Sequence, residues 1–327
     1  MARDGARPAY DPAGPDAGLR TALQELRAGR WMSMRTLLAE TTSWSLWTGR
    51  TQVLAAAAAG TDVVRTWLAE EPHSVPAVVM HARVAVERAL RAARGDHRRT
   101  QELWHEAWRA ADTAARASPT TRCRGCACWR WPGWTPSSAG RSTGSRRRSR
   151  CCRPARGGLL AEAGKRDPHN REAHHRMLQF LFGRAASGRL AEAVGFAQWA
   201  ADGAPPGSAL HVLPLYVRVE RYRRAGGSDA ALDLHWVAED ATREARRAFH
   251  FWFELTTAAE RSPLDLNHLA HALWGALQFP EAARVFDAIG PYYAPLPWAH
   301  RASDPSGHTA AVDVFLQARG RSTAHRP

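Results

Sequence analysis

The stretch that decides the fold is residues 265–289, which read DLNHLAHALWGALQFPEAARVFDAI. In its first half, large apolar residues recur at the spacing of one helix face, at Leu266, Leu269 and Leu273. A turn signal follows at Gln278-Phe-Pro-Glu, and the second half resumes helical spacing with smaller residues. The stretch therefore predicts two helices joined by a short turn.

The second helix of this pair carries a pattern of residues that recurs, in similar form, at two other places in the sequence. The three patterns are Ala107-x3-Ala111-x2-Ala114-x4-Pro119, Ala193-x3-Ala197-x2-Ala200-x4-Pro205 and Ala282-x3-Phe286-x2-Ile289. Small residues at i, i+4 and i+7 share one helix face and let a partner helix approach closely. The trailing proline then ends the helix. The patterns predict a repeated helical hairpin, with successive starts 86 and 89 residues apart.

These features resemble the tetratricopeptide repeat (TPR). Its first helix carries large residues spaced as in W-x2-L-G-x2-Y, and its second reads A-x3-F-x2-A before a proline. Residues 266–286 match a whole unit, whereas Met177-x2-Phe180 with Ala193 matches more loosely because the loop between them is longer. Ala111 stands where the repeat usually has an aromatic residue. Since one repeat spans about 34 residues, any hairpins between the three patterns must have diverged.

The resemblance implies an all-α fold, a right-handed α-solenoid of antiparallel helix hairpins, interrupted by an irregular Arg/Cys/Trp-rich segment. Solenoids of this kind bind a protein or peptide on an extended curved surface. Residues 50–54, 165–181 and 265–274 are also similar to helical-repeat proteins of GC-rich actinobacteria, and this second resemblance implies no activity.

The positive charge is concentrated in one segment. The 327 residues include 45 basic and 31 acidic side chains, for a net charge of +14. Residues 121–156 contain ten Arg and no Asp, Glu or Lys, so the remaining residues, with 35 basic and 31 acidic side chains, carry only +4. The overall charge is therefore not by itself an indication of a nucleic-acid partner.

Three interpretations of residues 121–156 stay open. Arg and Trp side chains could form a nucleic-acid arm that neutralises phosphates and stacks on bases. All five cysteines lie here, and Cys123-x2-Cys126-x-Cys128 with Cys151-Cys152 could bind zinc, although the spacing fits no standard finger. Alternatively the segment is translated out of frame, because another frame can restore an amphipathic helix. The composition favours a frameshifted stretch or a disordered linker that buries little.

The predicted organisation has five parts. They are a disordered tail (1–16), N-terminal helical hairpins (17–119), the anomalous segment (120–157), C-terminal TPR-like repeats (158–318) and a second disordered tail (319–327). Thr42 or Ser43 is expected to cap a helix that runs to Ala59, and a second helix is expected from Val75 to about Arg94, ended by Gly95. Gly29 is expected to separate two earlier helices. The segment from Leu213 is expected to be a helix interrupted by proline.

Several classes of protein are excluded or left without support. No run of 18 uncharged apolar residues occurs, so no transmembrane helix and no membrane partner are expected. The N-terminus lacks the apolar core of a signal peptide, which makes the cytoplasm the expected compartment. No Gly-rich phosphate loop is present, and we expect no cofactor.

Candidate site residues are few. Asn267-His268-x2-His271 places two imidazoles one helical turn apart, but no third metal ligand is identifiable, so we interpret these residues as partner-binding and expect no metal. Arg221 and Arg224 belong to Arg-rich faces that suit an acidic protein or peptide. His235-x3-Glu239 could pair a general base with an orienting carboxylate, yet no nucleophile accompanies it.

The sequence therefore predicts a non-catalytic helical-repeat scaffold that binds a protein or peptide. The alternative is a nucleic-acid-binding regulatory protein that uses the basic segment 121–156. In the run Phe249-His-Phe-Trp-Phe, the rings of Phe249, Trp252 and Phe253 fall on one face and are expected to be buried between hairpins.

Overall fold

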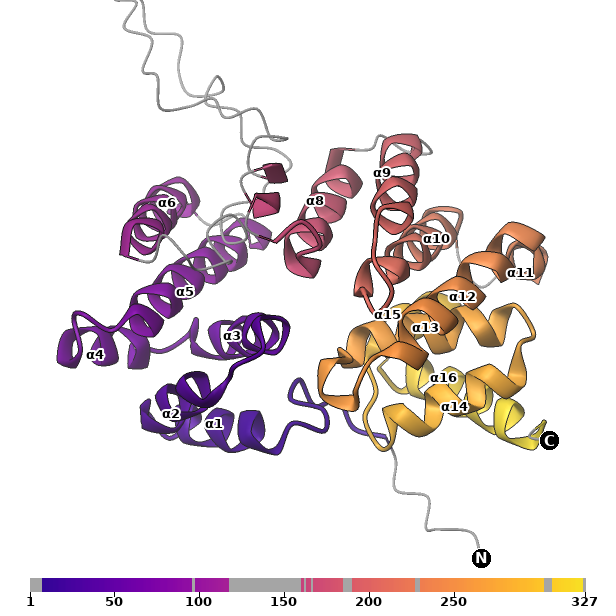
Figure 1. Cartoon of the computed structure of the whole chain (residues 1–327), viewed down its shortest axis with the longest axis horizontal. Helices are drawn as coiled ribbons and strands as arrows, with labels where there is room; N and C mark the ends of the chain where they lie inside the picture. Colours follow the sequence, from indigo (N-terminus) through magenta and orange to yellow (C-terminus); the bar gives the residue numbers. More distant parts are fainter. Residues whose placement is uncertain are drawn as a thin grey trace, which may run out of the picture. The chain divides into compact units, whose positions relative to one another are not determined.

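The computed structural model of the chain is all-helical (Figure 1). It describes residues 8–95, 98–117, 160–161, 163–165, 167–184, 190–226, 230–302 and 308–325. These residues contain α-helices, short 3-10 helices and no β-strand, with one isolated bridge between Ala9 and Tyr292. The predicted all-α class is thereby confirmed. The anomalous segment 120–157 lies outside the described residues, and so do the interpretations placed on it.

The chain divides into two compact units at positions other than those predicted. Unit 1 consists of residues 1–21 and 186–327, and unit 2 of residues 22–185. The first boundary falls inside α1 and the second after α8, whereas the sequence suggested boundaries on either side of the anomalous segment.

Unit 2 is built around its longest described helix. Its helices are α2 (Met32–Glu40), α3 (Trp44–Ala58), α4 (Val63–Glu70), α5 (Val75–Arg94), α6 (Thr100–Ala117) and α8 (Arg171–Arg184), preceded by most of α1 (Ala17–Arg27). Helix α5 packs against α6 on one side and against α3 and α4 on the other (Figure 1). Trp67, Met80 and Leu54 are fully buried in this unit.

Residues close to the helix ends of unit 2 fix where the helices begin and end. Ser43 begins α3, and its side chain accepts a hydrogen bond from the backbone N–H of Leu46 at 3.4 Å. Ser74 begins α5 in the same way, by accepting from Ala77 at 3.5 Å. Gly29, with φ of 80°, follows α1 and lets the backbone turn in the left-handed region.

A buried ion cluster joins α5 to α8 within unit 2. Arg83 donates two hydrogen bonds to Glu172, at 2.9 and 2.7 Å between Nη1 and Oε1 and between Nη2 and Oε2. Arg176 Nε donates to the same carboxylate at 2.8 Å. The side chains of Arg83 and Glu172 are 3% and 2% exposed, and Glu87 lies 3.9 Å from Arg176. Burial raises the pKa of Glu172, but attraction to the two guanidinium groups outweighs burial and lowers it to about 2.

Unit 1 is organised around α13. Its α-helices are α9 (Ala191–Asp202), α10 (Leu213–Arg224), α11 (Ala230–Val237), α12 (Glu239–Phe251), α13 (Pro263–Gly275), α14 (Phe279–Ile289), α15 (Pro295–Trp298) and α16 (His308–Ala324). Helices α10, α11, α12, α14, α15 and α16 all contact α13, which buries nine consecutive residues, Asp265–Leu273. Both helices predicted from residues 265–289 are confirmed as α13 and α14.

Two further expectations for unit 1 are confirmed. The segment that begins at Leu213 is helix α10, with Pro214 in its first turn after the 3-10 helix η4 (Ala209–Val212). Proline is tolerated there because the first turn leaves its N–H positions unpaired. Phe249, Trp252 and Phe253 are buried, whereas Phe251 is 49% exposed.

The predicted terminal tails differ from the structure in unit 1. Ala9 exchanges backbone hydrogen bonds of 3.1 Å with Pro291 and Tyr293, and Arg20 bonds both Asp11 Oδ2 at 3.1 Å and the Tyr292 hydroxyl at 2.6 Å. At the other end, α16 continues to Ala324 and buries Ser322 completely. Residues 8–16 and 319–325 are therefore ordered parts of the fold, because their partners lie elsewhere in the chain. None of the described helices has the length and apolarity needed to span a membrane.

Candidate functional site

The three candidate residues on α13 lie in the interior of unit 1. Asn267, His268 and His271 are 0%, 3% and 1% exposed. Helices surround α13 on all sides, so these side chains do not form the partner-facing surface that the sequence suggested. Within the described residues no group of three or more His, Cys, Asp or Glu could hold a metal ion.

Asn267 joins α13 to α15 by a hydrogen bond, and His268 joins α13 to α10 by ring stacking. Trp298 Nε1 donates to Asn267 Oδ1 at 2.8 Å, and Asn267 Nδ2 donates to the carbonyl of Pro263 at 2.8 Å. The His268 ring stacks on Tyr216, whose hydroxyl donates to Asp265 Oδ1 at 2.6 Å. These bonds satisfy buried polar groups, and they favour the packing of α10 and α15 against α13 over other arrangements.

His271 contacts residues that the sequence patterns did not single out. Arg301 Nε donates to His271 Nε2 at 2.7 Å, so the imidazole is neutral and carries its proton on Nδ1. Burial lowers the pKa of His271 well below its ordinary value, and the positive charge of Arg301 lowers it further. Nothing in the local sequence around Arg301 indicates this contact, which depends on η7 (Ala299–Arg301) reaching α13.

The Arg-rich faces of unit 1 are largely paired with acidic side chains. Arg224 Nε lies 2.7 Å from Glu220 Oε1, and Arg218 Nη2 lies 2.7 Å from Asp240 Oδ2. Arg221 is exposed and makes no ion pair with a described residue. Because most of this charge is neutralised within the chain, the expectation of an acidic partner loses much of its basis.

The possible base pair His235 and Glu239 does not form a site. His235 is exposed, and Glu239 is 94% exposed beside Arg243, at 3.4 Å. Water surrounds both groups, and they would act in a medium of high dielectric constant without a positioned substrate.

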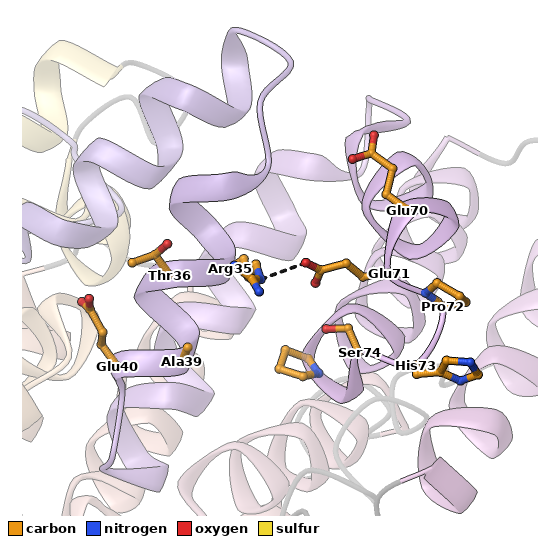
Figure 2. A pocket seen from close by; sticks show the side chains of 10 residues that line it. Arg35, Thr36, Ala39, Glu40, Glu70, Glu71, Pro72, His73 and Ser74 are labelled. Carbon is orange, nitrogen blue, oxygen red and sulfur yellow. Dashed lines mark ion pairs between the residues drawn. The ribbon is translucent and has the colours of Figure 1, made fainter.

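The described residues also form a groove in unit 2, between α2 and the connection from α4 to α5 (Figure 2). Its volume is about 760 Å³. The lining residues are Arg35, Thr36, Ala39 and Glu40 of α2, Glu70 of α4, Glu71, Pro72, His73 and Ser74 of the connection, and Pro76 of α5. We call this hollow the α2/α4–α5 groove.

Two contacts connect the two sides of the groove, an ion pair between Arg35 and Glu71 and a ring stack between Trp31 and Trp67. On each side the two residues are four positions apart. Figure 2 shows Arg35 and Glu71 extending toward each other, and Arg35 Nε lies 3.0 Å from Glu71 Oε1. Trp67 Nε1 donates to Glu71 Oε2 at 2.9 Å, and the Trp67 ring stacks on Trp31 with centroids 5.7 Å apart. The stacked rings and the ion pair therefore connect α2 with α4 and the residue that follows it, beside the groove.

The charged lining of the groove is predominantly acidic. The lining includes three carboxylates, of Glu40, Glu70 and Glu71, and one guanidinium, of Arg35, whose charge is engaged by Glu71. Glu40 and Glu70 are exposed and make no ion pair with a described residue. Sequence reasoning missed this groove because its walls are separated along the chain and no local pattern connects them.

The chain was compared with three sets of known proteins. Comparisons with protein families, with curated proteins and with solved structures find no match for this chain.

Proposed function

We propose that this protein is a non-catalytic helical scaffold that binds a basic segment of a partner protein in the α2/α4–α5 groove. The observation that carries the proposal is the combination of a groove of about 760 Å³ with an excess of carboxylates on its walls. That volume is within the range of sites that hold small ligands or a few residues of a peptide.

The charge of the groove opposes the charge of the rest of the chain. Outside residues 121–156 the chain carries a net charge of only +4, which does not attract a basic peptide, whereas Glu40 and Glu70 attract one locally. Two exposed carboxylates that line one groove and make no ion pair with a described residue favour a Lys or Arg side chain at that place. Arg35 already holds Glu71, so the two outer carboxylates are the ones available to a partner.

The arrangement of helices supports a repeat scaffold as the architecture behind this groove. Helix α13 is followed after a three-residue turn by α14, and the residues of the TPR-like pattern in this pair are buried. Ala107, Ala111, Ala193 and Ala197 are buried as well, as close helix contact at a small-residue stripe requires. We propose that the fold is an α-solenoid of stacked TPR-like hairpins.

The groove gives no support to a catalytic alternative. The Ser74 hydroxyl caps α5 by accepting from Ala77, and His73 is exposed on the same connection. A nucleophile requires a base within hydrogen-bonding reach, and no hydrogen bond joins the described side chains of His73 and Ser74.

The test is peptide binding to charge-reversed variants. A fluorescein-labelled peptide of alternating Arg and Ser is titrated with the full-length protein and followed by fluorescence anisotropy. We expect saturable binding that weakens about tenfold or more in Glu40→Lys/Glu70→Lys, because both reversed charges then repel the peptide. Binding should also weaken as salt increases.

A matched control separates the groove from general electrostatics. The pair Glu102→Lys/Asp112→Lys makes the same charge change on α6 of the same unit, at side chains that are 70% and 52% exposed. This variant should bind the peptide almost as the wild type does. Equal weakening in both variants, or no saturable binding by the wild type, would refute the proposal.

A further inference from the structure

Arg301 is a buried cation enclosed by aromatic rings in unit 1. Its side chain is 6% exposed at the end of η7. Its Cζ atom lies 4.8 Å from the ring centroid of Trp274, 5.2 Å from that of Tyr222 and 5.6 Å from that of Trp236. All three distances are within the range of cation–π attraction, which strengthens where water is excluded.

Two acceptors meet the edge of the same guanidinium group. Arg301 Nε donates to His271 Nε2 at 2.7 Å, and Nη1 donates to Asp233 Oδ1 at 2.7 Å. Tyr222 holds the carboxylate in place by donating its hydroxyl to Asp233 Oδ1 at 3.0 Å. The acceptors thus follow the planar fork of a guanidinium, while the rings contact it from other directions.

A glycine makes room for the third nitrogen. Arg301 Nη2 is buried without a hydrogen-bond acceptor, and it lies beside Gly275 at the end of α13. A Cβ atom at position 275 would stand 3.0 Å from Nη2 and 3.0 Å from Cβ and Cγ of Trp236. The absence of a side chain at Gly275 is therefore part of the shape that accepts the cation.

We propose that Tyr222, Trp236 and Trp274, together with Asp233 and His271, form a guanidinium-binding site that Arg301 occupies in cis. We call these five residues the guanidinium cage. The cage selects guanidinium over ammonium because its acceptors match two N–H directions of one planar group. An ammonium ion is a compact and strongly hydrated point charge that cannot use them together. This site is in unit 1 and does not depend on the groove of unit 2.

The test empties the cage and refills it with a free cation. In Arg301→Ala, the melting temperature should fall by roughly 5–10 °C, as expected for the loss of a buried cation with two charged hydrogen bonds. Methylguanidinium at millimolar concentration, far below the denaturing range, should restore part of this loss in a saturable manner. Methylammonium at the same concentration should restore none of it.

A double variant and a second measurement complete the test. Arg301→Ala/Gly275→Ala places a methyl group 3.0 Å from the position of Nη2, which is closer than van der Waals contact, so methylguanidinium should no longer stabilise it. The proposal is overturned by equal effects of the two cations, by the same effect on the wild type, or by no effect on folded Arg301→Ala. If that variant does not fold, NMR of the wild type decides: the Arg301 Nε–H resonance should lie away from the position of free arginine, and the proton should exchange slowly. A signal at the position of free arginine would refute the cage.

Discussion

Neutralising Glu172 should destabilise unit 2 strongly. The substitution Glu172→Gln keeps the shape of the side chain but removes its charge, and it leaves the guanidinium groups of Arg83 and Arg176 buried without their shared carboxylate. A buried cation that loses its partner retains the cost of its desolvation, which is why breaking such a cluster is far more harmful than breaking an exposed pair.

The magnitude follows from the pKa of Glu172. The folded protein lowers this pKa from 4.5 to about 2. At about 1.36 kcal/mol per pH unit, that difference corresponds to about 3 kcal/mol of stability at neutral pH. The carboxyl group is fully buried, so this value needs no reduction for screening by water. We expect Glu172→Gln to lower the free energy of unfolding by about that amount.

The pH dependence supplies an independent check on the same number. Because the pKa is lower in the folded state, the unfolded chain binds the proton first as pH falls. The stabilisation by Glu172 is therefore complete above about pH 4.5 and is lost as pH falls toward 2. The difference in stability between the wild type and Glu172→Gln should shrink over the same interval.

The assay is urea unfolding followed by circular dichroism at several pH values. Glu102→Gln is the matched control, because Glu102 is 70% exposed and pairs with Arg99 on the surface at 3.0 Å. This control should change stability by no more than about 0.5 kcal/mol. A loss below about 1 kcal/mol in Glu172→Gln, or a loss that stays constant from pH 7 to pH 2, would refute the role assigned to the cluster.

Three further substitutions test the packing of unit 1, each by urea unfolding. Leu277→Gly should stabilise by about 1 kcal/mol, since Leu277 has φ of 58° at the end of α13, and unchanged stability would argue against that backbone turn. Ala197→Leu should destabilise by about 1–3 kcal/mol because Ala197 is 1% exposed, whereas Val194→Leu, at a side chain 38% exposed, should have little effect; equal effects would contradict the small-residue stripe. Asn267→Leu should cost about 2–3 kcal/mol by depriving Trp298 Nε1 of its acceptor, and a neutral result would show that this bond is dispensable.

Local signals in the sequence predicted where helices begin and end. Ser43 and Gly29 act within three or four residues, so the hydrogen bond or the φ angle that each supplies is encoded where it is used. The same applies to the turn between α13 and α14, where the change from large to small residues marks two helices.

Contacts between distant residues account for what the sequence could not predict. His268 and His271 look like surface residues on a polar helix face, but α13 is enclosed by six other helices and its polar atoms are paired inside. The α2/α4–α5 groove and the guanidinium cage likewise need segments that no periodicity connects. Arg301, for example, meets Asp233 across 68 residues.

The pairing of Ala9 and Arg20 with residues near Tyr292 has a consequence for the order of assembly during synthesis. Arg20 and Tyr292 are separated by 272 residues. At ribosomal rates of about 5–20 residues per second, the N-terminal residues leave the ribosome roughly 14–54 s before their partners exist. Unit 2, whose residues all lie between 22 and 185, is complete in sequence well before that time. Residues around Ala9 and Arg20 therefore wait for the segment around Tyr292 before they reach their native contacts, and unit 1 cannot complete its fold until that segment has been made.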